Sequence, residues 1–222
     1  MHSLSIVINA RLKSTRVPNK LLRPFSNSTL FEIALEKISK IEFVDFIFVG
    51  IADDELISIA ENYPKIKILK RDLESVRKGT HKQTLTFKHY FQIPTDFIMT
   101  VNPCQPLLSL ESIKKGVDFF HNTEYNSYTS CIKIADWIFD EKGEPLTNRN
   151  KNNLTTNNLD YYKGSHSFHI INKKFFQKNQ YMWNFKSNDP ALIEIENPIE
   201  TLDVDTENEF EFTEFMYNKL IK

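Results

Sequence analysis

The chain has 222 residues, of which 41% are hydrophobic and 26% charged, with a formal net charge of −1 at pH 7. This length and composition suit one globular domain over residues 1–222, and the charge offers no basic field for nucleic acid or an anionic membrane. No apolar run approaches the roughly 20 residues that span a bilayer. Cys104 and Cys131 lack a CxxC spacing, which favours reduced thiols. We therefore expect a cytoplasmic protein.

Strand and helix signals alternate along the first half of the chain. Leu4–Asn9 is a continuous apolar run typical of a central strand, and no basic residues precede it as they would in a signal peptide. A basic loop follows, over residues 10–24. The pattern then predicts a helix over 29–38, a strand over 46–51, a helix capped by Asp53 or Asp54 and reaching about residue 62, and a strand over 66–69.

The same alternation continues in the second half. The pattern predicts helices over 80–91, 109–121 and 207–221, strands over 97–101, 128–134, 165–171 and 193–196, and a strand end at 201–205. Asn, Lys, Thr and acidic residues dominate residues 136–162, which indicates a long loop or a protruding arm. This order of elements predicts an α/β fold, a three-layer sandwich with a mostly parallel, Rossmann-like sheet.

The loop after the first strand concentrates cations. Within ten residues it contains Arg11, Lys13, Ser14, Thr15, Arg16 and Lys20. Ligands of open α/β sheets bind at the carboxyl ends of the strands, so this loop suits a triphosphate. The loop has no glycine and is therefore not a GxxxxGK[ST] phosphate loop. The alternative is a solvated basic surface.

Two carboxylates stand near the end of the chain, in Thr201-Leu202-Asp203-Val204-Asp205-Thr206. Residues two apart on a strand point to one face, so Asp203 and Asp205 can reach one ion. Carboxylates are expected ligands of Mg²⁺. The alternative is that Asp205 or Thr206 caps the following helix, and both roles can hold at once.

The basic loop resembles the signature of the cytidylyltransferases that make CMP-activated acid sugars, roughly A-R-x-x-S-[KT]-[GR]-[VIL]-P-x-K. The matching positions are Ala10, Arg11, Ser14, Thr15, Arg16, Val17, Pro18 and Lys20. The resemblance implies a fold of the nucleotide-diphospho-sugar transferase type, in which this loop wraps the phosphates of CTP. It also implies that Lys20, with Arg11 and Arg16, stabilises charge that develops on the phosphates. The late aspartates resemble the family's D-[IV]-D-T-x-x-[DE] motif, which holds the metal.

Other segments resemble the family's sugar and nucleotide sites. Residues 102–107 are similar to a Q-P-T-S-P-L segment of the sugar pocket, with Asn102 and Gln105 as departures. The Kdo branch would show an acidic D-E-P there, so its absence favours the acylneuraminate branch. The alternative is that residues 102–107 are a proline-rich strand end without a role in binding. The resemblance also assigns Arg71 and Thr80 to the cytidine part of the nucleotide.

His166 and His169 lie where the family has a strand at the sugar pocket, and they depart from its pattern. They could contact an acidic acceptor, and one could help to deprotonate its hydroxyl, because histidine titrates near neutral pH. The alternative is that both histidines have a structural role in the strand.

The resemblance implies a reaction between CTP and an acidic sugar of the nonulosonic type. The products would be a CMP-sugar for surface polysaccharide synthesis and pyrophosphate, with Mg²⁺ as cofactor. It also implies a homodimer formed through the arm, whose flanks carry Trp137, Ile138, Phe139, Tyr161 and Tyr162. Two alternatives remain: a cytidylyltransferase with a different acceptor, such as another acidic sugar, a phosphonate or a phosphorylated small acid, and an inactive homologue that binds nucleotide.

Overall fold

A seven-stranded sheet forms the centre of the protein. The structure is a computed structural model and describes residues 2–72, 75–76, 82–147 and 161–221. The strands are β1 (Leu4–Asn9), β4 (Phe46–Ile51), β5 (Ile66–Lys70), β6 (Phe97–Val101), β7 (Ser127–Ile134), β8 (Tyr161–Asn172) and β9 (Ala191–Glu194). Their order is β5-β4-β1-β6-β8-β7-β9. A separate two-stranded sheet pairs β2 (Pro24–Phe25) with β3 (Ser28–Thr29).

Strand β8 is the one strand that runs against the others among the described strands of the large sheet. It pairs antiparallel with β6 on one side and with β7 on the other, whereas the remaining pairs are parallel. The carboxyl ends of β1, β4 and β6 therefore meet the first half of β8 at one edge of the sheet. This edge is where α/β sheets bind ligands.

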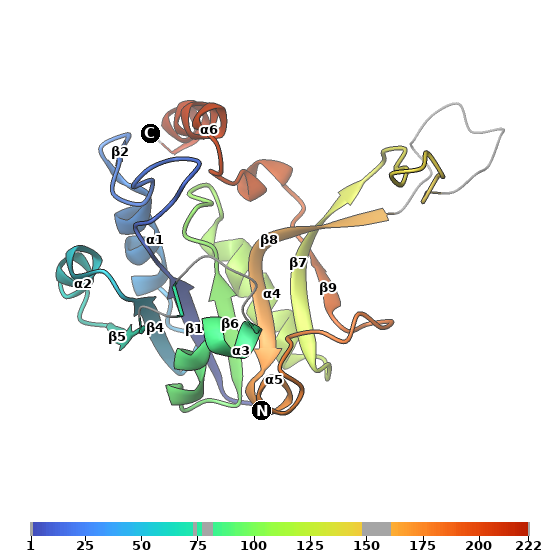
Figure 1. The fold of residues 1–222 in the computed structure, drawn as a ribbon, viewed down its shortest axis with the longest axis horizontal. Helices are drawn as coiled ribbons and strands as arrows, with labels where there is room; N and C mark the ends of the chain where they lie inside the picture. Colours follow the sequence, from blue (N-terminus) through green and yellow to red (C-terminus); the bar gives the residue numbers. More distant parts are fainter. Residues whose placement is uncertain (1, 73–74, 77–81, 148–160, 222) are drawn as a thin grey trace.

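Helices cover both faces of the sheet, as predicted (Figure 1). They are α1 (Leu30–Ser39), α2 (Asp54–Ala60), α3 (Gln83–Thr86), α4 (Leu110–His121), α5 (Lys173–Asn179) and α6 (Glu207–Leu220), with 3₁₀ turns η1 (Lys88–Gln92) and η3 (Pro198–Thr201). Side chains alternate across β1: Ile6 and Ile8 pack in the core with α1, α2, α4 and α6, and Val7 packs in the smaller core with η1 and α5. The three-layer α/β architecture follows from that alternation.

Reciprocal caps begin two of the helices. At α1, Thr29 Oγ1 accepts from the backbone N–H of Glu32 and donates to its carboxylate. At α6, Thr206 Oγ1 accepts from the N–H of Glu209 and donates to that carboxylate, which also accepts from the N–H of Asp205. Thr206 is therefore the cap of α6, and the carboxylate of Asp205 is available for other contacts.

Two local predictions were wrong, and a third held only in part. Residues 201–205 do not form a strand: Pro198–Thr201 is a 3₁₀ turn, and the irregular segment after it is held by a bond from the N–H of Val204 to the carbonyl of Cys104, 3.0 Å. The expected helix over 80–91 is divided at Phe87, whose φ of −113° and ψ of 30° are not helical. Asp53 is the N-cap residue of α2, as predicted, but its side chain makes no capping bond, and its carboxylate accepts from the N–H of Leu12 at 3.1 Å.

An arm leaves the body of the molecule where β7 ends and β8 begins (Figure 1). Ile134 pairs with Tyr161 at its base, and Phe139 forms an isolated bridge with Pro145. The exposed apolar side chains of this region are Trp137, Phe139, Leu146 and Tyr162. Among the described residues, no helix combines the length and apolarity that crossing a membrane requires.

Candidate functional site

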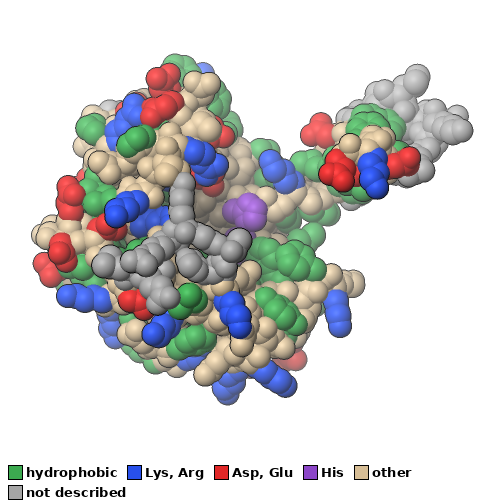
Figure 2. Space-filling view, viewed as in Figure 1, with side chains coloured by type: hydrophobic (Ala, Val, Ile, Leu, Met, Phe, Trp, Pro, Cys, Tyr) green, Lys and Arg blue, Asp and Glu red, His purple; other side chains and the backbone are tan. Residues whose placement is uncertain are grey.

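A cavity of about 480 Å³ opens at the carboxyl edge of the sheet. Its lining comes mainly from the basic loop and from the segment after β6: Asn9, Arg11, Ser14, Thr15, Arg16, Lys20, Leu21, Asn102, Pro103, Cys104 and Asp205. The structure thus brings together the predicted cations and one predicted metal ligand. On the face shown in Figure 2, histidine side chains lie in a hollow with Lys and Arg side chains nearby.

The fold of the basic loop explains how Lys20 reaches this cavity. Val17 is fully buried and anchors the loop, and Asn19 takes a left-handed conformation with φ of 52°, which asparagine tolerates better than most residues. Lys20 then extends its Nζ to the carbonyl of Val204, 2.6 Å, and to Oδ1 of Asp205, 3.0 Å. The loop is therefore tied to the segment that carries both aspartates.

Asp205 is held between two cations. Its Oδ2 lies 2.8 Å from Nη2 of Arg16, opposite the contact of Oδ1 with Lys20. Burial alone would raise the pKa of Asp205, but the hydrogen bonds and charges of Lys20 and Arg16 lower it below its ordinary value. Burial by contrast favours a lower pKa for Lys20, but the nearby Cys104 thiol and the Asp205 carboxylate together raise it above its ordinary value. Both groups are therefore charged at neutral pH.

Asp203 has different surroundings. Its Oδ2 accepts from Nδ2 of Asn102 at 2.9 Å, and its Oδ1 is buried without a hydrogen-bond partner among the described residues. Burial, and then the charge of Asp205, raise the pKa of Asp203 above its ordinary value. A buried carboxylate oxygen without a donor is the kind of group that a cation would satisfy.

The described residues offer a divalent ion only part of a ligand shell. No three His, Cys, Asp or Glu side chains gather within them closely enough to hold a metal. An ion at Asp203 and Asp205 would need further oxygen ligands from substrate phosphates and water. That incomplete shell suits Mg²⁺, which keeps several waters and binds substrate phosphates.

The segment after β6 supports Asp203. Asn102 donates to that carboxylate while its own Oδ1 accepts from the N–H of Cys104, at 2.9 Å. Gln105 is buried, and its Nε2 donates to the carbonyl of Ser165 in β8 at 2.9 Å. Asn102 lines the cavity, whereas Gln105 does not line it and instead links this segment to β8.

His169 lies in a second cavity of about 250 Å³. The lining is largely aromatic: Asn9, Gln83, Phe87, Tyr90, Thr100, His169, Tyr181, Met182, Trp183 and Phe185. Nδ1 of His169 is 2.8 Å from Oγ1 of Thr129, and its Nε2 is 3.4 Å from Nδ1 of His166. Burial, and then the charge of His166, lower the pKa of His169 to about 4, so its ring is neutral at pH 7.

Two of the predicted nucleotide residues that the structure describes do not line the charged cavity. The side chain of Ala10 is buried, and its N–H donates to the carbonyl of Gly50 at 3.0 Å. Nη2 of Arg71 donates to the carbonyls of Ser75 and Thr86, both at 3.1 Å. Thr80 lies outside the described residues.

Two residues of the site escaped the sequence analysis. Asn9 lines both cavities, and its amide is fixed by the hydroxyl of Tyr90 at 2.6 Å and by Nε2 of His89 at 2.7 Å. Its position at the carboxyl end of the first strand was the available signal. Cys104 lines the charged cavity with a neutral thiol, because burial raises its pKa to about 11.

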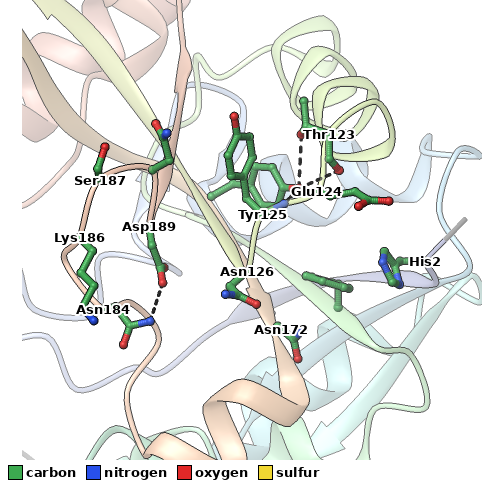
Figure 3. Close-up of a pocket in the computed structure, with 13 residues that line it drawn as sticks. His2, Thr123, Glu124, Tyr125, Asn126, Asn172, Asn184, Lys186, Ser187 and Asp189 are labelled. Carbon is green, nitrogen blue, oxygen red and sulfur yellow. Dashed lines mark hydrogen bonds between the residues drawn. The ribbon is translucent and has the colours of Figure 1, made fainter.

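A wider cavity, of about 680 Å³, lies at the opposite ends of the central strands, where the parallel strands begin (Figure 3). It is lined where β6 and β7 begin and where β8 ends, near Phe97, Tyr128 and Asn172. Its buried acid, Asp189, already accepts from Ser127 and Asn184. The amino ends of the strands are not the usual place for a ligand in this architecture, and the basic loop does not reach this cavity.

Comparison with known proteins matches residues 5–219 to the cytidylyltransferase family. A 3-deoxy-manno-octulosonate cytidylyltransferase of Francisella tularensis subsp. novicida (strain U112) is 29% identical over 137 residues, 61% of this chain and 54% of that protein. The enzyme of the same name from Rickettsia bellii (strain OSU 85-389) is 27% identical over 135 residues, 59% of this chain and 53% of that protein. The chain thus spans about half the length of the curated relatives it matches.

Solved structures share the fold across nearly the whole chain. A CMP:2-keto-3-deoxy-manno-octonic acid synthetase complexed with CTP has a TM-score of 0.70 at 14% identity, covering 98% of this chain and 99% of that one. A 4-diphosphocytidyl-2C-methyl-D-erythritol synthase from Anaerococcus prevotii DSM 20548 has a TM-score of 0.66 at 15% identity, covering 98% and 96%. These likenesses support the fold, and the match over residues 5–219 shows that the chain belongs to the cytidylyltransferase family.

Proposed function

We propose that the protein transfers the cytidylyl group of CTP to a hydroxyl of an acidic sugar and releases pyrophosphate. The observation that carries this proposal is one cavity in which Arg11, Arg16 and Lys20 gather beside Asp205. Its volume of about 480 Å³ is within the range of small-molecule sites. Membership of the cytidylyltransferase family supports CTP as the donor.

The proposed reaction is a direct displacement at the α-phosphorus. The acceptor hydroxyl forms the new P–O bond and loses its proton, while the bond from the α-phosphorus to the bridging oxygen breaks and pyrophosphate leaves. Lys20 would neutralise charge that develops at the α-phosphate, and Arg11 and Arg16 would do so for the leaving group. Ser14, in the same lining, would donate a hydrogen bond to a phosphate oxygen.

Asp203 and Asp205 fit a Mg²⁺ site in this proposal. The buried Oδ1 of Asp203, which has no hydrogen-bond partner among the described residues, supports it. When bound, Mg²⁺ neutralises phosphate charge and orients the triphosphate. Arg16 and Lys20 would exchange Asp205 for phosphate oxygens as the nucleotide enters.

Two observations bear on the acceptor. The curated relatives described above act, by their names, on 3-deoxy-manno-octulosonate, which is an acidic sugar. The segment 102–107, however, lacks the acidic residues expected of that branch and instead presents Asn102 and Gln105. We therefore propose an acidic sugar of the nonulosonic type as the acceptor, with Kdo as the second candidate. The proposed reaction takes place in the cytoplasm, and its product serves the synthesis of surface polysaccharide.

Pyrophosphate release tests this proposal. CTP, UTP, ATP and GTP are each offered with Mg²⁺ and with neuraminic, legionaminic and pseudaminic acids, Kdo, a phosphonate and a phosphorylated small acid. We expect release with CTP and one nonulosonic acid. Release with Kdo alone would move the acceptor to the second candidate, and release with a phosphonate or phosphorylated acid would move it outside acidic sugars. No release with any acceptor, combined with Mg²⁺-dependent CTP binding, would contradict the activity and favour a nucleotide-binding homologue.

A further inference from the structure

Lys37, in α1, holds the backbone of the segment that follows β6. Its Nζ donates to the carbonyl of Pro106 at 2.9 Å and approaches the carbonyl of Gln105 at 3.4 Å. The same carbonyl of Gln105 accepts from the N–H of Leu108 at 3.2 Å. Lys37 thus ties a helix on one face of the sheet to the turn between β6 and α4, and it does not line the charged cavity.

That turn connects several parts of the proposed acceptor side. Asn102 donates to Asp203, the carbonyl of Cys104 accepts from the N–H of Val204 at 3.0 Å, and Gln105 donates to Ser165 in β8. The backbone at Gln105 and Pro106 is therefore one end of a short chain of bonds that reaches Asp203. A displacement at these carbonyls would move the amide of Asn102 and the cavity wall behind it.

The charge of Lys37 has little compensation. Burial lowers the pKa of Lys37 to about 7, with the charge of Glu200 from η3 acting in the opposite direction. Glu200 itself accepts from the N–H of Ser109 at 2.9 Å. On α1, Glu36 pairs at the surface with Lys40, at 2.8 Å. Lys37 makes no direct ion pair with the residues that the structure describes, so the carbonyls of Gln105 and Pro106 are what satisfies this partly buried amine.

We propose that Lys37 is a positioning residue for acceptor transfer: from α1 it fixes the backbone at Gln105 and Pro106 and thereby places Asn102 against Asp203. This inference rests on the proposed cytidylyl transfer. Lys37 touches neither nucleotide nor acceptor in it and acts through the turn. Its loss should impair use of the acceptor more than binding of CTP, because the cations that would bind the phosphates come from the basic loop, which the buried Val17 anchors independently of this turn.

The kinetic test replaces Lys37 by methionine, which keeps the apolar stem and removes the donor. For Lys37→Met we expect kcat/KM for the acceptor to fall by about 10- to 100-fold, the scale of a displaced reactant, with KM for CTP within about twofold of wild type. Lys40→Met is the matched control, since it removes a surface lysine at the C-cap of the same helix. Equal losses for CTP and acceptor, or no loss, would overturn the positioning role.

Hydrogen exchange separates this inference from the proposed reaction. In Lys37→Met, peptides covering 102–109 and 203–206 should exchange faster than in wild type and Lys40→Met, while β5, at the far edge of the sheet, is unchanged. If wild type transfers nothing to any acceptor, this exchange still decides the role of Lys37, and only the reaction fails. Unchanged exchange in both peptides would overturn the inference. If Lys37→Met lacks a cooperative melt, Lys37→Gln, whose amide can still donate to one carbonyl, takes its place with the same expected direction.

Discussion

Asp203 and Asp205 are separated by one residue, and their pKa values are shifted in opposite directions. Asp203 has one oxygen that is buried and has no hydrogen-bond partner within the described part of the chain, and burial raises the pKa of this carboxyl. Asp205 lies between Arg16 and Lys20, which lower its pKa in spite of burial. The difference arises because the irregular segment 202–205 directs one carboxylate towards Asn102 and the other towards the basic loop.

The lowered pKa of Asp205 predicts a pH-dependent stability. A carboxylate with a depressed folded-state pKa stabilises the protein above its unfolded value of about 3.9, and this contribution disappears as pH falls through the folded value. We expect wild type to melt higher than Asp205→Asn at pH 7 and the difference to shrink below about pH 4. Thermal melts of both proteins from pH 7 to pH 2.5, about the range of this transition, measure it. A difference that stays constant over this range would contradict the prediction.

Lys20 allows a test of the proposed transition-state role. Lys20→Ala should lower kcat by about 100-fold or more, which is the scale seen when one donor to a developing charge is removed. Lys13→Ala is the control, because Lys13 is an exposed cation in the same loop that does not line the cavity. Pyrophosphate release at saturating substrates measures both variants. A Lys20→Ala turnover within a few fold of wild type, or a matching loss in Lys13→Ala, would count against the role.

At the scale of elements, β4 and η1 pack without space between them. A Cβ atom at Gly50 would lie 2.6 Å from Nε2 of His89 and 3.2 Å from Oδ1 of Asn9. His89 is buried and bonded to Asn9, so its ring cannot move aside without breaking that contact. The missing side chain at Gly50 is therefore what lets His89 hold Asn9 between the two cavities.

Gly50→Ala should destabilise the protein by about 1 to 3 kcal/mol, the usual cost of overpacking a buried site. Gly164→Ala is the matched control, because the nearest atom to its added Cβ is Nε2 of His166 at 4.0 Å. Chemical denaturation of the two variants and wild type provides the comparison. Similar unfolding free energies for Gly50→Ala and wild type would mean that the His89 ring has room to shift.

Elements with strong local signals could be predicted from sequence. The apolar runs of β1 and β4 and the Thr29 and Ser109 caps of α1 and α4 are local patterns, and the structure has these elements within a residue or two of the expected bounds. The short helix α5 was missed, because its seven residues bury only Phe176 and produce weak periodicity.

Features that depend on distant partners could not be predicted. Local sequence does not specify that β8 enters between β6 and β7 in the opposite direction, which is what brings His169 beside Thr129. The structure brings Arg16 and Lys20 against Asp205. Their catalytic and metal-binding roles, and the acceptor roles of Asn102, Gln105, His166 and His169, stay predictions.

At the scale of the whole molecule, the arm presents apolar side chains away from the main core. Phe139 is 56% exposed and Trp137 is 41% exposed. Exposed aromatic side chains on a protruding element are typical of an interaction surface. A homodimer formed through the arm therefore remains the proposed assembly.

Phe139→Asp should shift a homodimer towards the monomer, since a charge placed in an apolar interface loses its solvation. Phe212→Asp is the control: Phe212 is 53% exposed but lies on α6. Sedimentation of wild type and both variants over a range of concentrations distinguishes them. A monomeric wild type, or equal dissociation by the two variants, would contradict assembly through the arm.

The pairing of Ile134 with Tyr161 has a consequence for how such a chain can diversify. The sequence between these two residues can therefore lengthen or shorten without changing the register of β7 and β8. Closing a longer loop costs little, because loop entropy grows only with the logarithm of length. The arm can therefore change in length during evolution without any change in the cavity. If the protein assembles through the arm, its assembly could then diverge between relatives that catalyse the same reaction.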